Sequence, residues 1–126
     1  MPSLRKILHV EDDPDILEIA HIALADVGGL EVLQCASGHE ALRVAEEFDP
    51  DLILLDVMMP GLNGEETFTR LRSLDRLKNT PIVFMTAKGN QTSIDRLMRL
   101  GAVAVIVKPF DPMSLAEQLD QKMQSL

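Results

Sequence analysis

Residues 50–64, PDLILLDVMMPGLNG, contain the segment that decides the fold. Four consecutive apolar residues, 52–55, precede a single acid, Asp56, and a loop with proline and glycine follows. A short apolar run without polar alternation is typical of a parallel strand that is covered on both faces. An acid is costly in such a stretch unless it is paired or lies at the strand end. We therefore expect Asp56 at the carboxyl end of a buried strand.

Four more short apolar runs lie on either side of this segment, and helical patterns separate them. The five predicted strands are residues 5–10, 30–35, 52–55, 81–85 and 103–107. Strict alternation of strands and helices predicts a parallel sheet with helices on both faces and right-handed crossovers. The sequence therefore predicts one α/β, doubly wound (βα)5 domain over residues 1–126, with no linker and no output domain in this chain.

Helix boundaries follow from capping residues and apolar stripes. Asp13 and Pro14 are typical of a helix start, and Gly28 of its end; Asp111 and Pro112 predict the start of the last helix. The inward-facing positions repeat every three to four residues. They are Ile16, Ala20, Ala23 and Leu24, then Ala41, Leu42, Ala45 and Phe48, then Phe68 and Leu71, then Ile94, Leu97 and Met98, and finally Leu115, Leu119 and Met123.

Composition and charge exclude several classes of function. The formal net charge of −8 argues against a broad basic face, so no direct nucleic-acid binding is expected. No apolar run approaches the ~20 residues that span a bilayer, so no membrane insertion is expected. The single Cys35 excludes an internal disulfide and fits a reducing cytoplasm. We interpret Cys35 as a small buried residue rather than a reactive thiol.

Polar residues stand at four of the five predicted strand ends. Asp12 and Asp13 follow the first strand, Asp56 the third, Thr86 the fourth and Lys108 the fifth. Taken singly, each has an ordinary structural interpretation as a loop acid, a helix cap, a strand-end hydroxyl or a surface lysine. In doubly wound sheets, however, ligands bind beyond the carboxyl ends of the strands. The agreement of four strand ends indicates one functional site.

The residue types at this edge favour metal-assisted phosphoryl chemistry. Neighbouring carboxylates repel one another, and Mg²⁺ relieves the repulsion by binding one or two carboxylates with waters and phosphate oxygens. Aspartate is a known nucleophile in phosphoryl transfer, which demands mainly positioning and charge stabilisation. We therefore expect Asp56 to accept a phosphoryl group, whose oxygens the metal, Lys108 and the Thr86 hydroxyl would hold. Ala87 is small enough to admit the donor.

Four segments together resemble the receiver domain of bacterial two-component response regulators, of the single-domain, CheY-like kind. They are VEDD at 10–13, the segment 50–64 quoted above, PIVFMTA at 81–87, and Gly101-Ala102 followed by VKPF at 107–110. The resemblance covers essentially the whole chain. It implies a flavodoxin-like fold whose five-stranded parallel sheet has the order 2-1-3-4-5 with helices on both faces.

The resemblance also implies a phosphodonor and a metal. Asp56 would take its phosphoryl group from a phosphohistidine on a sensor histidine kinase or a histidine phosphotransfer protein, and small phosphodonors such as acetyl phosphate often substitute. Mg²⁺, or Mn²⁺ in its place, is expected on Asp13, Asp56 and the backbone carbonyl of Met58, with Asp12 assisting through water. Such a protein is a phosphoacceptor that assists its own phosphorylation and dephosphorylation, not a multiple-turnover enzyme on an external substrate.

Conformational signalling is implied in the same way. Thr86 is expected to swing toward the phosphoryl oxygen, and Lys108 to bind it as a charged donor. The Lys108–Pro109 peptide bond is expected to be cis. The output partner is expected at the face formed by the fourth helix, fifth strand and fifth helix, where Arg96 and Arg99 lie one turn apart.

The chain departs from the receiver pattern at two places. Receivers commonly carry an aromatic residue or histidine three residues before the lysine, and this chain has Val105 there. The usual coupling of Thr86 to an aromatic side chain is therefore in doubt, and the loop and helix after Thr86 are an alternative route. Met58 and Lys88, two residues beyond Asp56 and Thr86, leave the lifetime of the phosphorylated state open.

Two other classes of function compete with this interpretation. A degenerate receiver would act only as a protein-interaction module, and the complete set of acids, hydroxyl and lysine argues against it. A small phosphatase of the haloacid-dehalogenase kind would need an acid two residues after its nucleophile, where this chain has Met58.

Overall fold

The computed structural model describes residues 4–126, which form alternating strands and helices. The strands are β1 (Lys6–Val10), β2 (Glu31–Cys35), β3 (Leu52–Asp56), β4 (Ile82–Thr86) and β5 (Ala104–Val107). The α-helices are α1 (Pro14–His21), α2 (Gly38–Phe48), α3 (Gly64–Arg72), α4 (Gln91–Leu100) and α5 (Leu115–Gln124). A π-helical segment, η1 (Ile22–Val27), continues α1, and a short 3₁₀ turn, η2 (Asp75–Leu77), follows α3. Every predicted strand is confirmed to within one residue at either end.

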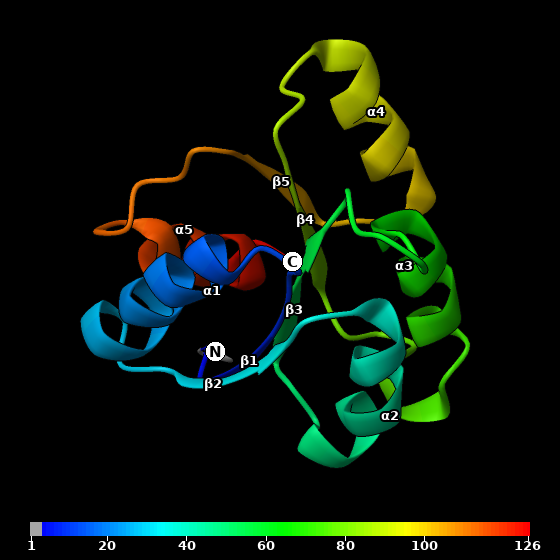
Figure 1. Ribbon diagram of the computed structural model, residues 1–126, viewed down its shortest axis with the longest axis horizontal. Helices are drawn as coiled ribbons and strands as arrows, with labels where there is room; N and C mark the ends of the chain where they lie inside the picture. Colours follow the sequence, from blue (N-terminus) through cyan, green and yellow to red (C-terminus); the bar gives the residue numbers. More distant parts are fainter. Residues whose placement is uncertain (1–3) are drawn as a thin grey trace.

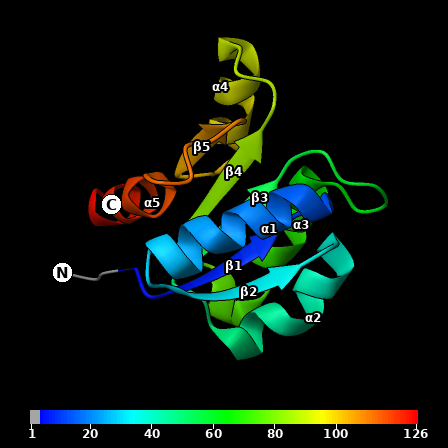
Figure 2. The ribbon, with the colours of Figure 1, turned by 60° about the vertical axis from the view of Figure 1, so that its left-hand side comes forward.

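The five strands form one parallel sheet in the order β2-β1-β3-β4-β5, which confirms the predicted topology. In Figures 1 and 2, α1 and α5 lie on one face of the sheet and α2 and α3 on the other, while α4 projects at one end of the molecule. Because all strands run the same way, their carboxyl ends share one edge of the sheet. Asp56 is the last residue of β3 at this edge.

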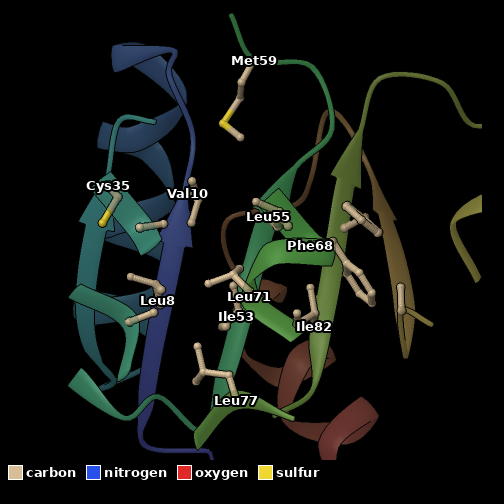
Figure 3. Packing of buried hydrophobic residues seen from close by; sticks show 14 of the residues in the cluster. Leu8, Val10, Cys35, Ile53, Leu55, Met59, Phe68, Leu71, Leu77 and Ile82 are labelled. Atoms are coloured by element: carbon tan, nitrogen blue, oxygen red, sulfur yellow. The ribbon is translucent and has the colours of Figure 1, made fainter. Parts of the chain in front are cut away.

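Two apolar cores sandwich the sheet because each central strand buries both faces. Ile53 and Leu55 point into the core beneath α2 and α3, which Figure 3 shows together with Phe68 and Leu71. Leu52 and Leu54 point into the opposite core, beneath α1, η1 and α5. All five residues of β3 are buried, as the unbroken apolar run predicted.

The helix starts follow capping chemistry. The Asp13 carboxylate accepts a hydrogen bond from the Asp15 backbone N–H at 2.9 Å, so the predicted cap of α1 is confirmed. Asn63 and Glu66 form a reciprocal capping box at α3. The predicted start of α5 is wrong by three residues: Asp111 accepts from the Met113 N–H at 3.0 Å, but residues 112–114 form a turn and the regular helix begins afterwards.

The last two turns of the first predicted helix have a different geometry from the one expected. The stripe of Ile16 to Leu24 predicted one continuous α-helix, whereas residues 22–27 adopt π-helical hydrogen bonding up to Gly28. The predicted inward residues Ala20, Ala23 and Leu24 are nevertheless fully buried. In α4 the stripe is only partly right, because Leu97 is buried while Met98 is 42% exposed.

Gly64 places the start of α3 directly against the end of β3. A Cβ atom at this position would lie 2.2 Å from the Asp56 carbonyl oxygen and 2.7 Å from the Val57 Cα. Only glycine allows so close a backbone approach, so this residue is part of what positions Asp56. Within residues 4–126, no helix is both long and apolar enough to cross a membrane.

Candidate phosphoacceptor site

The candidate site lies at the carboxyl edge of the sheet, where backbone hydrogen bonds hold neighbouring strand ends together. The Val57 N–H donates to the Met85 carbonyl at 3.1 Å, and the Lys108 N–H donates to the Thr86 carbonyl at 2.8 Å. These bonds tie the end of β3 to β4, and β4 to the residue that follows β5. The Lys108–Pro109 peptide bond is cis, as the family resemblance implied.

Lys108 joins two buried acids. Its Nζ lies 2.5 Å from Asp56 Oδ1 and 3.0 Å from Glu11 Oε1. The Asp56 and Glu11 side chains are 2% and 1% exposed, and that of Lys108 is 17% exposed. The predicted neighbours Asp56 and Lys108 are thus in direct contact.

Burial and charge act against each other in this cluster. Desolvation raises the pKa of Asp56 above its usual range, although Lys108 acts to lower it, and the charge of Asp12 adds to the rise. Desolvation likewise raises the pKa of Glu11, again against the effect of Lys108. Burial alone would lower the pKa of Lys108, but its ion pairs with Asp56 and Glu11 outweigh burial and raise it. The ammonium therefore stays charged, but its effect on the two acids offsets their desolvation only in part.

The acidic cluster differs from the predicted one by one residue. Carboxylate oxygens of Glu11, Asp12 and Asp56 lie within 4.8 Å of one another. Asp13, which the sequence analysis gave to the metal, lies outside this group, and its carboxylate caps α1 through the Asp15 N–H. The Asp-Pro pattern, which is typical of a helix cap, was the signal that one Asp13 oxygen accepts a hydrogen bond at the start of α1. Glu11, which stands at the same strand end but was not among the predicted metal ligands, belongs to the group instead.

Thr86 is buried at the end of β4, and its hydroxyl faces the following loop. Its Oγ1 accepts a hydrogen bond from the Lys88 backbone N–H at 3.0 Å. Met58 and Lys88 line one pocket with Thr86, and the Met58 side chain is 66% exposed. Val105 on β5 is half-buried against the α2–α3 core, where it occupies the position expected to carry an aromatic switch.

The donor atoms of this site fit a hard divalent cation. Asp56 Oδ2 is buried and accepts no hydrogen bond from any residue between 4 and 126. Asp12 is exposed, which leaves one side of the cluster open to solvent. Oxygen ligands, excess negative charge and an open side match the preferences of Mg²⁺, which keeps several waters when bound to proteins.

Two other buried polar groups near this edge are structural. Burial, with a smaller effect of Lys108, lowers the pKa of His9 to about 4, so this imidazole stays neutral at physiological pH. Its Nδ1 pairs with the Gln34 side-chain amide at 3.1 Å. Cys35 is buried, and desolvation raises the pKa of its thiol to about 12. The expectation that Cys35 is a buried apolar residue agrees with this.

Nearly the whole chain matches a known protein family. The family model of the response regulator receiver domain matches residues 7–120. The phosphate regulon transcriptional regulatory protein PhoB of Pseudomonas aeruginosa is 36% identical over 115 residues, which are 91% of this chain and 50% of that protein. The DNA-binding response regulator MtrA of Mycolicibacterium smegmatis is 33% identical over 120 residues, 95% of this chain and 51% of that protein. The chain thus spans about half the length of these curated relatives.

Solved structures agree in fold. The chemotaxis protein CheY4 of Vibrio cholerae superposes with a TM-score of 0.86 at 33% identity, covering 94% of this chain and 98% of that one. The receiver domain of the sensor histidine kinase PA1611 from Pseudomonas aeruginosa, solved with a magnesium ion in its active site cleft, has a TM-score of 0.85 at 28% identity, covering 97% and 99%. The chain therefore belongs to the response regulator receiver domain family of two-component signalling proteins.

Proposed function

We propose that this domain accepts a phosphoryl group on Asp56 from a phosphohistidine of a sensor histidine kinase or histidine phosphotransfer protein. The observation that carries the proposal is the contact of a buried strand-end aspartate with Lys108, beside an acidic cluster that is open to solvent. In the transfer, an Asp56 carboxylate oxygen attacks phosphorus and the P–N bond to the histidine breaks. The imidazole leaves with the bonding electrons and becomes neutral by taking up or retaining a proton, and Asp56 becomes an acyl phosphate.

The chain's own residues would position this reaction. Lys108 holds Asp56 Oδ1, which leaves Oδ2 without a hydrogen bond. The three donors of the ammonium allow it to follow a phosphoryl oxygen while it keeps its contact with Glu11. Thr86 would donate its hydroxyl to a second phosphoryl oxygen after turning away from the Lys88 N–H.

We propose Asp12, Asp56 and the Met58 backbone carbonyl as the magnesium ligands, with Glu11 assisting in place of Asp13. When bound, Mg²⁺ (or Mn²⁺) would neutralise the charge that develops on the phosphoryl oxygens. The assignment of Glu11 rests on its position in the cluster, and its Oε2 also accepts from the Asp13 backbone N–H at 3.2 Å. This bond links the cluster to the start of α1.

Proteins of this family are generally not enzymes that turn over an external substrate, and we propose the same of this chain. We also propose that the conformational change acts on a partner at the α4–β5–α5 face, in the cytoplasm where the kinase would present its phosphohistidine. That face exposes apolar side chains, with Met98 42% and Val107 40% exposed. The relatives that are DNA-binding regulators suggest control of transcription as one output, through a partner or a domain beyond residues 1–126.

The decisive experiment is incubation with acetyl phosphate and Mg²⁺, followed by intact-mass spectrometry. Wild type should gain the mass of one phosphoryl group, and Asp56→Asn should gain none while keeping its fold by circular dichroism. Labelling of the variant at the wild-type level would remove Asp56 as the acceptor. Because some receivers ignore small phosphodonors, beryllofluoride binding followed by NMR is the second arm. No response of wild type in either arm would favour a degenerate receiver that acts only as an interaction module.

A further inference from the structure

Helix α4 buries little of its surface against the rest of the domain. Of its ten residues only Leu97 is buried. Met98 and Leu100 are 42% and 37% exposed, and Figures 1 and 2 show the helix projecting beyond the sheet at one end of the molecule. A helix with so little buried surface moves at low cost in free energy, so individual side-chain contacts weigh more in its position.

One ion pair ties α4 to α3. Arg96 Nε donates to Glu65 Oε1 at 2.9 Å, and its Nη2 donates to Glu65 Oε2. Both carboxylate oxygens are therefore held by one guanidinium, which is the strong, directional form of such a pair. The side chains are 66% and 26% exposed, so solvent screens the pair only partly on the Glu65 side.

The ion pair lies beside residues of the candidate site. Glu65 and Arg96 line a pocket of about 110 Å³ together with Met58, Thr86 and Ser93. Glu65 is the second residue of α3, directly after Gly64, whose backbone packs against the Asp56 carbonyl. The ion pair thus links α4 to the residues that position Asp56.

The loop between β4 and α4 is held on its other side by Thr86. The Lys88 N–H donates to Thr86 Oγ1, and α4 begins shortly after, at its cap Asn90. If Thr86 turns toward a phosphoryl group, it releases this N–H and frees the loop. Val105 has no ring that could follow Thr86 inward, which favours the β4–α4 loop and α4 as the route of the change.

We infer that the Glu65–Arg96 ion pair is a latch that holds α4 against α3 in the unphosphorylated domain. Opening the latch would favour the arrangement of the β4–α4 loop that accepts a phosphoryl group. This inference deepens the proposed function and rests on it for the coupling to Asp56. Arg96 and Glu65 are positioning residues here, since neither contacts Asp56 or Lys108. Any ligand that binds the open arrangement better must bind more tightly once the latch is removed.

The test is a double-mutant cycle with Glu65→Gln and Arg96→Gln, read out by titration with beryllofluoride in saturating Mg²⁺. Each single variant should bind about twofold to fivefold more tightly than wild type, the size expected for a partly exposed ion pair. The double variant should bind no more tightly than either single one, because the latch opens only once. Arg99→Gln, which removes an exposed arginine of the same helix, is the control and should leave the affinity unchanged.

Hydrogen exchange of the ligand-free protein separates the latch from phosphorylation. Amides of α4 should exchange faster in Glu65→Gln and Arg96→Gln than in wild type or Arg99→Gln. Unchanged exchange overturns the latch, whether or not the protein binds beryllofluoride. If exchange is faster but the beryllofluoride affinity is unchanged, the latch is not coupled to the site. The coupling is also overturned if the effects of the two single variants add in the double variant. If wild type binds no beryllofluoride, both the proposed function and the coupling are contradicted. The exchange measurement then still tests whether the ion pair holds α4.

Discussion

The neighbouring acids Asp12 and Asp13 should respond differently to loss of charge. Asp12 belongs to the cluster with Glu11 and Asp56, whereas the Asp13 carboxylate caps α1. The matched variants Asp12→Asn and Asp13→Asn each remove one negative charge and keep the size of the side chain. Asparagine is as good a helix cap as aspartate, so the second variant keeps its cap. Only Asp12→Asn should weaken Mg²⁺ binding strongly.

The size of the effect follows from charge and distance. Two unit charges 4 Å apart interact by about 1 kcal/mol in water. A ligand bound directly or through one water is about 4 Å or less from the ion, and the double charge of Mg²⁺ raises the energy to about 2 kcal/mol. Asp12→Asn should therefore weaken Mg²⁺ binding about thirtyfold or more. Asp13 contributes no carboxylate oxygen to the cluster, and salt weakens interactions between exposed charges that are not in contact, so Asp13→Asn should change the affinity far less, by about twofold.

Calorimetric or NMR titration with Mg²⁺ measures both affinities, and urea unfolding in EDTA checks stability. Asp13→Ala, which removes the cap, should lower the unfolding free energy by about 1 kcal/mol. Asp12→Ala should not lower the unfolding free energy, because it relieves repulsion in the cluster. Equal loss of Mg²⁺ affinity in the two asparagine variants, or a larger loss in Asp13→Asn, would refute the assignment and restore Asp13 as the ligand.

Three further perturbations test the site. Lys108→Ala should lower the unfolding free energy by about 3 kcal/mol in EDTA, because Glu11 and Asp56 lose their cation. Added Mg²⁺ should restore part of the lost stability, and an unchanged urea midpoint in EDTA would contradict this prediction. Because burial raises the pKa of Asp56 above its usual 3.8, the folded domain keeps this proton to higher pH than the unfolded chain. The unfolding free energy of wild type minus that of Asp56→Asn should therefore fall as pH rises above about 4 without metal, and a rise would reverse the assigned sign. Gly64→Ala should lower the unfolding free energy by about 2–4 kcal/mol and weaken beryllofluoride binding, because its Cβ would lie 2.2 Å from the Asp56 carbonyl oxygen. Wild-type stability and binding in this variant would show that the backbone shifts without cost at this position.

The sequence pattern alone predicted a parallel α/β sheet and placed three candidate site residues at one edge of it, whereas the strand order came from the family resemblance. Residues 52–55 form an unbroken apolar run because a central parallel strand buries both faces, and this local pattern needs no knowledge of the partner strands. Parallel strands place their carboxyl ends at one edge, so Asp56, Thr86 and Lys108 could be brought together from their strand positions alone. The helix cap at Asp13 was equally local, since a cap and its N–H donor are two residues apart.

Tertiary packing sets which carboxylates contact Lys108 and which residue of α3 pairs with α4. Three acids follow β1 in succession, and strand position alone does not say which of them point toward the Asp56 side chain. The direction depends on where β1 ends and α1 begins, which places Glu11 against Lys108 and turns Asp13 away. The Glu65–Arg96 pair joins residues 31 positions apart on two helices, so no local pattern of charge could predict it. Short-range chemistry set the strands and caps, whereas the contacts that tune the site exist only after distant segments have packed together.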